Sequence, residues 1–408
     1  MTDKVMITAE TPDPLFHNLI VLSLEQALTL PFLTYRLALE GMRVIRVENP
    51  RRGDPNRYVG ENVLDEEGMN TYYLPYNGGK EAITLNLATE EGRAVLHELI
   101  ARLPADIFTC NTLPRNYARL GIDHEALRQI KPDLIWVGIT GFGPDSNEPA
   151  YDPILQARSG FMNLTGDPDG PPQVFGLPMV DLGAAEHAYG QVMKALYRRA
   201  ATGEGSRIDI AMYRSAVSWM VIPVMMARSF GKVMTRQGNT HPIFAPVSVN
   251  ATADGYVYIA VGSDQQWERV TQLPGFERLN REEYQRNAGR IAAKETLNRE
   301  MAEITRTRSS DELIALFNDI GVPISRIYNV AEVVEDPYLV ADMIHARDSR
   351  TGVKITLPPP PVVTRFLREQ GRRISFPPRL GEHNEQVYGE VLGYGLAEVA
   401  ALREQGVV

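Results

Sequence analysis

Short apolar runs alternate with helically periodic segments through the amino-terminal part of the chain. Residues 19–24 and 44–47 have strand composition, and residues 31–40 between them place apolar side chains at helical spacing before Gly41. The same alternation recurs at 82–87, 90–102 and 106–109, and again at 123–130 and 134–139. This pattern is typical of an open α/β sheet with parallel strands. We therefore predict the α/β fold class.

The second half of the chain has a different character. A long helical region at about 182–228 is followed by strand composition at 247–261, where Asp254-Gly255 predicts a hairpin turn, and by charged helical stretches at 281–306 and 311–320. A chain of 408 residues exceeds what one core usually organises. We predict a large domain beginning with residues 1–228, a smaller α+β domain at 229–340, and a crossing segment at 341–408. The crossing segment contains the proline-rich residues 357–361 and returns as a helix to the large domain.

Charge and cysteine content exclude several classes of protein. The formal net charge of -9 argues against a general binder of nucleic acid or of an anionic membrane. The single cysteine, Cys110, excludes an internal disulfide and a multi-cysteine zinc site, and it fits the cytoplasm. At the end of a predicted strand, Cys110 is better explained as a buried structural thiol than as a nucleophile.

Two segments bear on targeting and on membrane insertion. The amino terminus, Met1 to Pro14, has no apolar core of the kind found in signal peptides, so we expect none. The longest apolar run, residues 216–227, is interrupted by Pro223. It is too short to span a bilayer and predicts a buried helix.

Basic side chains gather after the second predicted strand. In an acidic protein, such a cluster at the carboxyl end of a strand is where a phosphate-bearing ligand would bind, although a solvated charged loop explains it equally well. Two further candidates are Asn77-Gly-Gly-Lys80 and Asn111 with Arg115 and Arg119. No mononucleotide-binding glycine loop occurs, which disfavours a kinase or a dehydrogenase. The cluster consists of Arg43, Arg46, Arg51, Arg52 and Arg57.

A sharper constellation surrounds Asp181. It follows Gly176-Leu-Pro-Met-Val and precedes Leu-Gly-Ala-Ala185, so it sits where a helix N-cap belongs, with small residues behind it. An aspartate cap is an ordinary stabilising device worth about 1 kcal/mol. Alternatively, the helix terminus keeps the carboxylate ionised, the small residues leave room for a bulky substrate, and Asp181 is a nucleophile toward an activated acyl group. The spacing alone does not choose between the two. The histidines form no helical metal pair, and no serine nucleophile motif occurs.

The ordered set of short motifs resembles the class III CoA-transferases, the formyl-CoA and carnitine CoA-transferase family. Each motif is weak by itself, but their order along most of the chain is specific. The matching motifs are Gly41-Met-Arg-Val-Ile-Arg-Val-Glu48, Gly53-Asp54, Asn77-Gly-Gly-Lys80, Ile83-Thr-Leu-Asn-Leu87, Glu91-Gly92, Asn111, Arg119-Leu-Gly121, Gly138-Ile-Thr-Gly-Phe-Gly143, Tyr151-Asp152, Gln156-Ala157, Ser159-Gly160, Thr165-Gly-Asp-Pro-Asp-Gly-Pro-Pro172, Pro178, Asp181, Thr202-Gly-Glu-Gly205, Asp209-Ile-Ala-Met212, Asp254-Gly-Tyr256, Trp267, Gly321-Val-Pro323 and Asp336-Pro337.

The resemblance implies a fold and a mechanism. It implies a Rossmann-like large domain built from both ends of the chain, a smaller domain between, and an interlocked dimer, either a homodimer or a heteromer with a related subunit. It implies a CoA-transferase in which Asp181 forms an aspartyl anhydride and then an aspartyl-CoA thioester, with an acyl-CoA donor, a carboxylic acid acceptor and no metal or permanent cofactor. The residues implied to hold CoA are Asn49, Arg52, Lys80, Asn111, Arg119, Tyr151 and Asp152.

Departures from the family pattern bear on the acyl group. The usual Ala-Gly-Pro after the first strand is replaced in Leu28-Thr-Leu-Pro31, and the usual Asn-Phe-Arg-Pro-Gly is Asn111-Thr-Leu-Pro-Arg115. A dicarboxylic or aromatic acyl group, such as a succinyl-CoA donor with a substituted succinate acceptor, is the expectation. One alternative is the family's 2-methylacyl-CoA racemase branch, but its histidine would fall at Tyr151, so the base is missing and this branch is disfavoured. Another is a non-catalytic subunit of a heteromeric transferase.

Overall fold

A computed structural model describes residues 15–408, so the Met1 to Pro14 segment, where no signal peptide is expected, lies outside the described residues. The chain divides into two compact units. Of the described residues, the first comprises 15–159 together with 176–222 and 338–408, and the second comprises 160–175 and 223–337. Both ends of the chain therefore contribute to the first unit.

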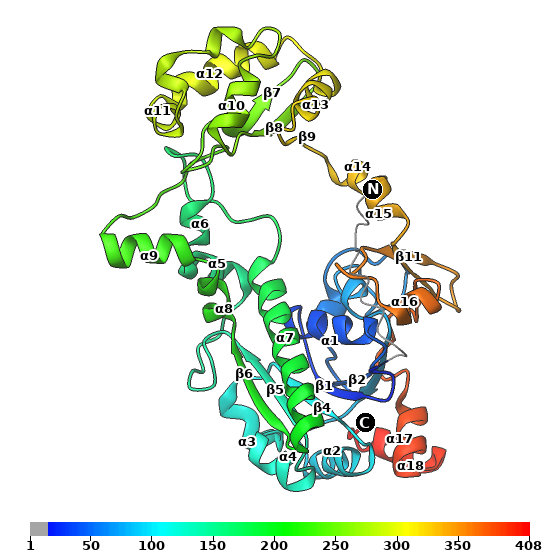
Figure 1. Cartoon of the computed structure of the whole chain (residues 1–408). Coiled ribbons are helices and arrows are strands. Elements are labelled where there is room, and N and C mark those ends of the chain that lie inside the picture. Colours follow the sequence, from blue (N-terminus) through cyan, green and yellow to red (C-terminus); the bar gives the residue numbers. More distant parts are fainter. Residues whose placement is uncertain (1–14) are drawn as a thin grey trace. The chain divides into compact units, whose positions relative to one another are not determined.

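The first unit is built on a six-stranded parallel sheet with the strand order β3-β2-β1-β4-β5-β6 (Figure 1). This is the Rossmann order, in which the strand sequence reverses direction between β1 and β4 and ligands bind at the carboxyl ends of the strands. The predicted α/β fold class is confirmed. The strands are β1 (Ile20–Leu24), β2 (Arg43–Glu48), β3 (Lys80–Thr84), β4 (Ile107–Cys110), β5 (Ile135–Thr140) and β6 (Ser206–Ala211).

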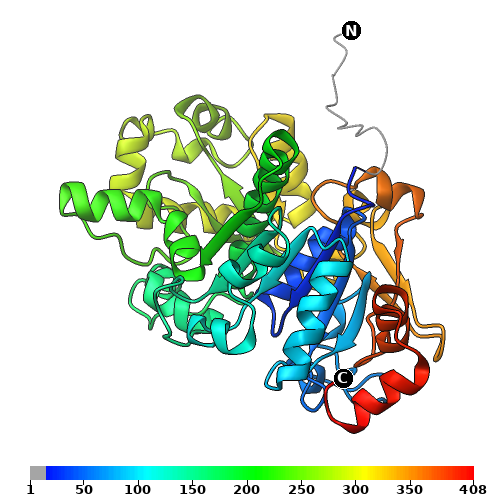
Figure 2. The same cartoon turned by 90° about the horizontal axis from the view of Figure 1, so that it is seen from below.

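Helices from three parts of the chain pack on this sheet. Helices α1 (Thr29–Leu39) and α7 (Met179–Thr202) pack against each other. Apolar side chains of α2, α4, α17 and α18 share one core with the strands, and Figure 2 shows the two carboxyl-terminal helices in red beside the sheet. The bounds of these four are α2 (Glu90–Arg102), α4 (His124–Ile130), α17 (Asn384–Leu392) and α18 (Leu396–Glu404).

The rest of the first unit consists of short elements and a second, small sheet. That sheet has the order β11-β10-β12, and the proline-rich residues after β11 adopt neither helix nor strand. The tail returns to the first unit as two helices, because Gly393 takes a left-handed conformation between them. The elements are α3 (Tyr117–Leu120), α5 (Asp152–Ser159), α8 (Met212–Ser218), β10 (Ile344–Arg347), β11 (Lys354–Leu357), α16 (Arg365–Glu369) and β12 (Arg373–Ile374).

The second unit packs helices on a three-stranded sheet of order β7-β8-β9. The hairpin predicted at Asp254-Gly255 is confirmed, because Ala251 pairs with Tyr256 across that turn. The elements are α6 (Phe161–Leu164), β7 (Val247–Ala251), β8 (Tyr256–Ala260), α10 (Asp264–Val270), α11 (Asn287–Ala292), α12 (Lys294–Thr305), α13 (Ser310–Asp319), β9 (Ile324–Arg326) and α14 (Val330–Val333), with α9 (Val221–Phe230) and α15 (Pro337–Val340) at its boundaries.

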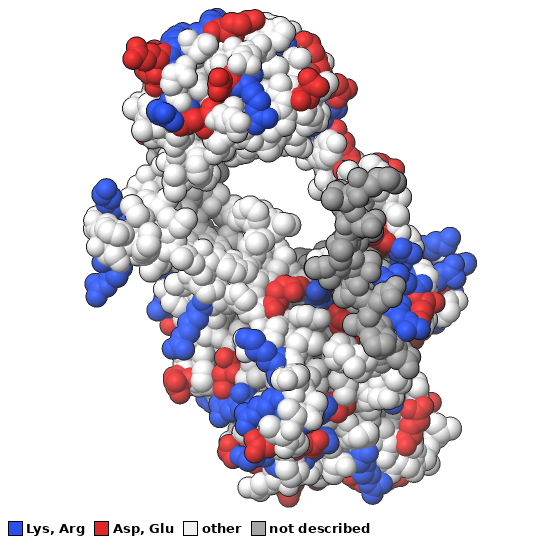
Figure 3. Space-filling model, viewed as in Figure 1, with Lys and Arg blue, Asp and Glu red and all other residues white. Residues whose placement is uncertain are grey.

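Two predictions in the region 182–228 are wrong. The region is not continuously helical, because α7 ends at Thr202, with Gly203 as its C-cap, and is followed by strand β6. The residues of β6 before the buried Ala211 alternate between half-buried and exposed. The apolar run at 216–227 is not one buried helix but parts of α8 and α9. Every residue of α9 is at least partly exposed, and its surface in Figure 3 is mostly white between basic side chains. None of the helices within residues 15–408 is long and apolar enough to cross a membrane.

Candidate active site

Asp181 lies in the first turn of α7, not at its N-cap. The helix begins at Met179 with Pro178 as its N-cap, and Pro178 provides no side-chain cap. The capping acceptor comes from Asp152, whose Oδ2 accepts hydrogen bonds from the backbone N–H groups of Val180 at 2.7 Å and Asp181 at 3.1 Å. The cap prediction for Asp181 is therefore wrong, and its own carboxylate is available for other contacts.

The Asp181 carboxylate receives a hydrogen bond from the first residue of another helix. The Thr29 hydroxyl, at the start of α1, donates to Asp181 Oδ1. The same hydroxyl lies 3.7 Å from the Met212 sulfur, and only 5% of Thr29 is exposed. Asp181 thus sits at the meeting point of the first turns of two helices.

The surroundings of Asp181 raise the pKa of its carboxyl group. Burial raises the pKa of the Asp181 carboxyl to about 6 and the Asp152 charge adds to the increase, while the Thr29 hydrogen bond opposes it. Burial raises the pKa of Tyr72 and of Tyr76, and the Asp181 charge contributes to both shifts, so these phenols lie within its field. Near neutral pH the carboxylate is ionised and more nucleophilic than an exposed aspartate.

The small residues behind Asp181 do not all leave open space. A Cβ on Gly183 would lie 1.9 Å from the Trp219 ring, so the indole fills the room beside that glycine. Ala184 and Ala185 are fully buried. The expected room for a bulky substrate is therefore not found beside Gly183, where the small residue serves close packing with Trp219.

A pocket of about 270 Å³ lies at the carboxyl ends of the central strands. Its walls come from the ends of β1 and β2 and from the segments after β3 and β4. Three residues predicted to hold CoA line it, namely Asn49, Asn111 and Arg119. The Asn111 amide also bonds the backbone of Gln26 in both directions, at 2.7 and 3.2 Å, and so fixes the loop after β1. Arg119 is exposed.

The other predicted CoA residues lie elsewhere in the first unit. Arg52 is exposed in the loop after β2, where its backbone N–H donates to Asn49 Oδ1 at 3.3 Å. Tyr151 is 74% exposed, while its neighbour Asp152 is buried and caps α7. The Lys80 ammonium is fully buried, donating to Glu25 at 2.8 Å and to the carbonyl of Pro31 at 2.9 Å.

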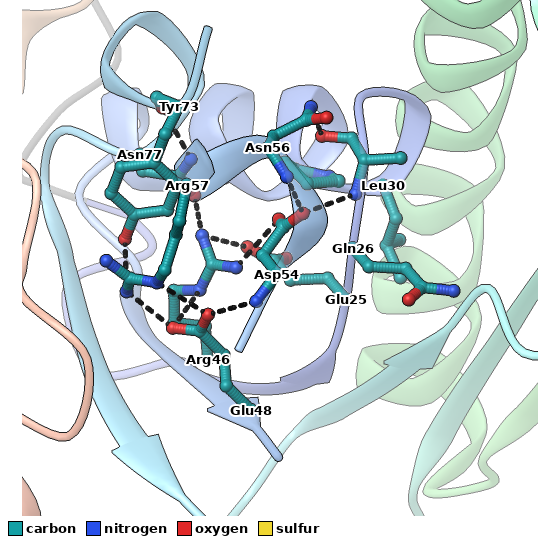
Figure 4. Close-up of polar contacts among 12 residues, drawn as sticks. Glu25, Gln26, Leu30, Arg46, Glu48, Asp54, Asn56, Arg57, Tyr73 and Asn77 are labelled. Carbon is teal, nitrogen blue, oxygen red and sulfur yellow. Dashed lines mark hydrogen bonds and ion pairs between the residues drawn. The ribbon is translucent and has the colours of Figure 1, made fainter. Parts of the chain in front are cut away.

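The basic cluster after β2 is largely an internal network. Arg46 and Arg57 are buried and both pair with Glu48, at 3.1 and 2.6 Å (Figure 4). Arg46 also pairs with Asp54 at 3.0 Å, and the Arg57 guanidinium lies over the Tyr73 ring. Arg43, on β2, pairs with Glu81 and Glu390. Of the five clustered arginines, only Arg51 and Arg52 are exposed, so the phosphate-site interpretation of the whole cluster is wrong.

Sequence reasoning missed Thr29 as a partner of the nucleophile candidate. The available signal was the departure at Leu28-Thr-Leu-Pro31, which was interpreted only as bearing on the acyl group. The loop that carries Thr29 is held by Asp54 Oδ1, which accepts from the Ala27 N–H at 3.0 Å, and by the Asn56 amide, which donates to the Ala27 carbonyl at 2.7 Å. Figure 4 shows Asp54 between Arg46 and Asn56.

Cys110 is a buried thiol, as predicted. It is fully buried at the end of β4, and burial raises its pKa to about 12. A thiol so disfavoured as thiolate is a poor nucleophile. Within residues 15–408 no three His, Cys, Asp or Glu side chains gather in a way that could hold a metal ion.

Known proteins resemble this chain along most of its length. The model of CoA-transferase family III matches residues 16–384. The chain is 30% identical to succinyl-CoA:glutarate CoA-transferase from Homo sapiens, covering 95% of this chain and 88% of that protein. It is 34% identical to succinyl-CoA:mesaconate CoA-transferase from Haloarcula hispanica, covering 91% and 95%.

A solved structure extends the likeness to the fold. The CAIB/BAIF family protein from Brucella suis superposes with a TM-score of 0.78 at 32% identity, over 91% of this chain and 98% of that one. The family match covers both units and includes Asp181, Asp152 and the residues of the strand-end pocket. The chain therefore belongs to CoA-transferase family III.

Proposed function

We propose that this enzyme moves CoA from a dicarboxylic acyl-CoA to a dicarboxylic acid through a covalent intermediate on Asp181. The observation that carries the proposal is the Asp181 carboxylate itself. Asp152 caps α7, so the Asp181 carboxylate does not have to. Thr29 donates a hydrogen bond to this carboxylate, and burial raises its pKa to about 6. These properties suit a nucleophile that must attack a thioester near neutral pH.

The chemistry proceeds by exchange at three carbonyl groups, those of the donor, of Asp181 and of the acceptor. An Asp181 oxygen attacks the donor thioester carbonyl, and the C–S bond breaks to release CoA thiolate and leave an aspartyl anhydride. The thiolate then attacks the aspartyl carbonyl, releasing the donor acid and forming an aspartyl-CoA thioester. The acceptor carboxylate attacks that thioester to form a second anhydride, whose acyl carbonyl takes back the thiolate. One thioester is made for each one broken, so no separate energy source is consumed.

We propose succinyl-CoA as donor and a C4 or C5 dicarboxylic acid as acceptor, because the relatives above are named for succinyl-CoA with glutarate or mesaconate. Incubation with succinyl-CoA should add CoA to the intact protein mass, and hydroxylamine should remove it. Chromatography should then show new acyl-CoA thioesters with glutarate and with methyl-substituted C4 diacids, and little product with acetate as the monocarboxylic control. Transfer to acetate alone would refute the dicarboxylic assignment.

For the CoA site, we propose that the strand-end pocket receives the phosphate-bearing part of the coenzyme. Arg119, which follows β4, is the exposed cation on the pocket wall. Asn49 follows β2, on the other side of the point between β1 and β4 where the strand order reverses, and Arg52 lies in the same loop as Asn49. Tyr151 is exposed and available for contact, whereas Asp152 and Lys80 act through the atoms they hold in place. A positively charged side chain at this edge suits a phosphate ligand.

We also propose that the enzyme is a dimer and that α9 lies in its interface. The helix exposes Val221, Val224 and Phe230 at 68%, 46% and 62%, an apolar surface of the kind that marks interaction sites. Light scattering after size-exclusion chromatography should give twice the chain mass. Val224→Glu with Phe230→Glu should shift it toward the single-chain mass, whereas Val362→Glu, at a valine outside α9 that is 65% exposed, should not. A wild-type monomer would contradict the proposal, and a need for a second gene product would identify a heteromer.

A further inference from the structure

We propose that the Thr29 hydroxyl is a catalytic oxyanion donor for the two exchanges that occur at the Asp181 carbonyl. This inference rests on the covalent function proposed above. Thr29 Oγ1 donates its hydrogen to Asp181 Oδ1, the oxygen of the reacting group itself. The hydroxyl is therefore in direct contact with a reacting atom.

The two Asp181 oxygens have different fates in the exchange. The oxygen without the Thr29 hydrogen bond attacks the donor thioester and becomes the bridging atom of the anhydride, whereas Oδ1 stays doubly bonded to Cγ. When CoA thiolate adds to Cγ, the C=O electron pair moves onto Oδ1 to give a tetrahedral oxyanion. Its collapse restores the carbonyl and expels the donor acid with the bridging oxygen. The acceptor carboxylate then adds to Cγ of the aspartyl-CoA thioester, which gives an equivalent oxyanion on Oδ1, and its collapse breaks the C–S bond and releases CoA thiolate.

A hydrogen bond at Oδ1 favours these steps because the charge on that oxygen grows between ground state and transition state. In both the anhydride and the aspartyl-CoA thioester, Oδ1 is a neutral carbonyl oxygen, and it carries a full negative charge in the tetrahedral intermediates. Hydrogen bonds to charged acceptors are about twice as strong as those to neutral ones. The donor therefore stabilises the transition state more than the covalent intermediates.

The donor is fixed in place before reaction. Ala27, two residues ahead of Thr29, has a φ of +63°, an uncommon conformation for a residue other than glycine. Its N–H is held by Asp54 and its carbonyl by Asn56, while Asn111 binds the backbone of Gln26 on both sides. Thr29 then begins α1, so the following turn is held by helical hydrogen bonds. A donor fixed in this way needs little reorganisation when the oxyanion forms.

The sequence shows that the hydroxyl is a feature of this chain rather than a requirement of the pattern it resembles. Pro31 matches the proline of the usual Ala-Gly-Pro, so Thr29 stands where that pattern has alanine. Alanine at this position would offer no hydrogen to Oδ1. The inference therefore concerns how this enzyme treats its own aspartyl carbonyl.

The test compares Thr29→Ala, Thr29→Val and Thr29→Ser, with the exposed Thr202→Ala on α7 as the matched control. Turnover of succinyl-CoA with glutarate is measured from pH 5 to 9. At pH 8.5, where Asp181 is ionised in every variant, kcat should fall by about 10- to 100-fold for the alanine and valine variants, with KM for the acyl-CoA little changed. The serine variant should keep most of the activity. The acid limb should also move to higher pH, because the Thr29 hydrogen bond lowers the Asp181 pKa.

The outcomes separate this role from simpler ones. If the acid limb moves but kcat at pH 8.5 equals wild type, Thr29 affects only ionisation and the oxyanion role is overturned. If Thr29→Ser has the same low kcat as Thr29→Ala, and both variants unfold at the same temperature as the wild type, the hydroxyl is not the active group. Reactions quenched at successive times add a direct measure. The rate at which CoA becomes attached to the protein, followed by intact mass, should fall with kcat. If Asp181→Ala keeps full activity, the proposed covalent function fails instead, whatever Thr29 does.

Discussion

Replacing Asp181 by alanine is expected to abolish both CoA transfer and the covalent attachment of CoA. Loss of a covalent nucleophile removes the route rather than weakening it, and we expect kcat to fall by at least about 10³-fold. Wild-type activity should rise with pH through an acid limb near 6, because the attacking form is the carboxylate and burial sets its pKa there. Transfer assays and intact-mass measurement at several pH values check both expectations.

A stability measurement distinguishes catalytic loss from misfolding. The folded-state pKa of Asp181, about 6, lies above the ordinary aspartate value of 3.8, so its stabilising contribution is present at low pH and is lost as the pH rises through 6. At pH 8 the ionised carboxylate therefore costs stability, and Asp181→Asn should raise the unfolding free energy by about 1–2 kcal/mol. Glu385→Gln, which changes an exposed carboxylate on α17, should alter neither activity nor stability. An active Asp181→Ala protein would refute the nucleophile assignment.

The parallel sheet was predictable because short apolar runs, typical of buried strands, alternate along the sequence with segments whose apolar residues recur at helical spacing. The limits of α2 were predicted to the residue, and β1, β2, β4 and β5 within one residue or two. The edge strand β6 was missed, although its alternation of exposed and half-buried residues is a strand signal, because this short segment directly follows the long α7 and was included in the helical region predicted at 182–228. The exposure of α9 was also missed. Apolar composition indicates only that a helix face is kept away from water. Burial in the core of the chain and burial in an interface between chains both meet that condition, so composition does not distinguish them.

The site shows a similar division. Asp181 and the strand-end residues Asn49, Asn111 and Arg119 follow from short motifs placed at the ends of strands. The contacts that decide their roles join segments far apart in sequence. Asp152 caps α7 across 29 residues, and Thr29 meets Asp181 across 152. Because such pairs depend on the packing of α1, α5 and α7, no local pattern reports them.

Lys80 is the residue whose predicted and observed surroundings differ most, and its replacement by methionine should be the most destabilising single change discussed. Its ammonium and the Glu25 carboxylate are fully buried, 2.8 Å apart. Burial lowers the Lys80 pKa to about 8, and although burial alone would raise the Glu25 pKa, Lys80 and Arg46 hold it below its usual value. Removing the cation leaves a buried carboxylate 3.9 Å from Arg46. We expect a loss of about 3–5 kcal/mol in unfolding free energy at pH 7, where the Lys80 ammonium is still protonated.

The pH dependence and a double variant identify the cause of that loss. Without Lys80, burial should raise the Glu25 pKa above its unfolded value, so the variant recovers stability as the pH falls and the carboxyl is neutralised. Adding Glu25→Gln should restore a substantial part of the loss at pH 7, because it removes the unpaired charge. Urea unfolding curves, compared at pH 5 and pH 7, measure both effects.

Arg119→Ala is the matched change to a cation on the pocket wall, and it should behave in the opposite way. Arg119 is exposed and its one hydrogen bond, to Asn116 at 3.2 Å, is a surface contact, so the unfolding midpoint should stay within experimental error of wild type. Its loss should raise KM for succinyl-CoA and for every other CoA thioester by a similar factor. Were Lys80→Met to leave stability intact and raise KM in the same uniform way, Lys80 would contact CoA directly and the buried pair would not describe the enzyme in solution. A KM change confined to one acceptor acid would instead place Arg119 in the acyl site.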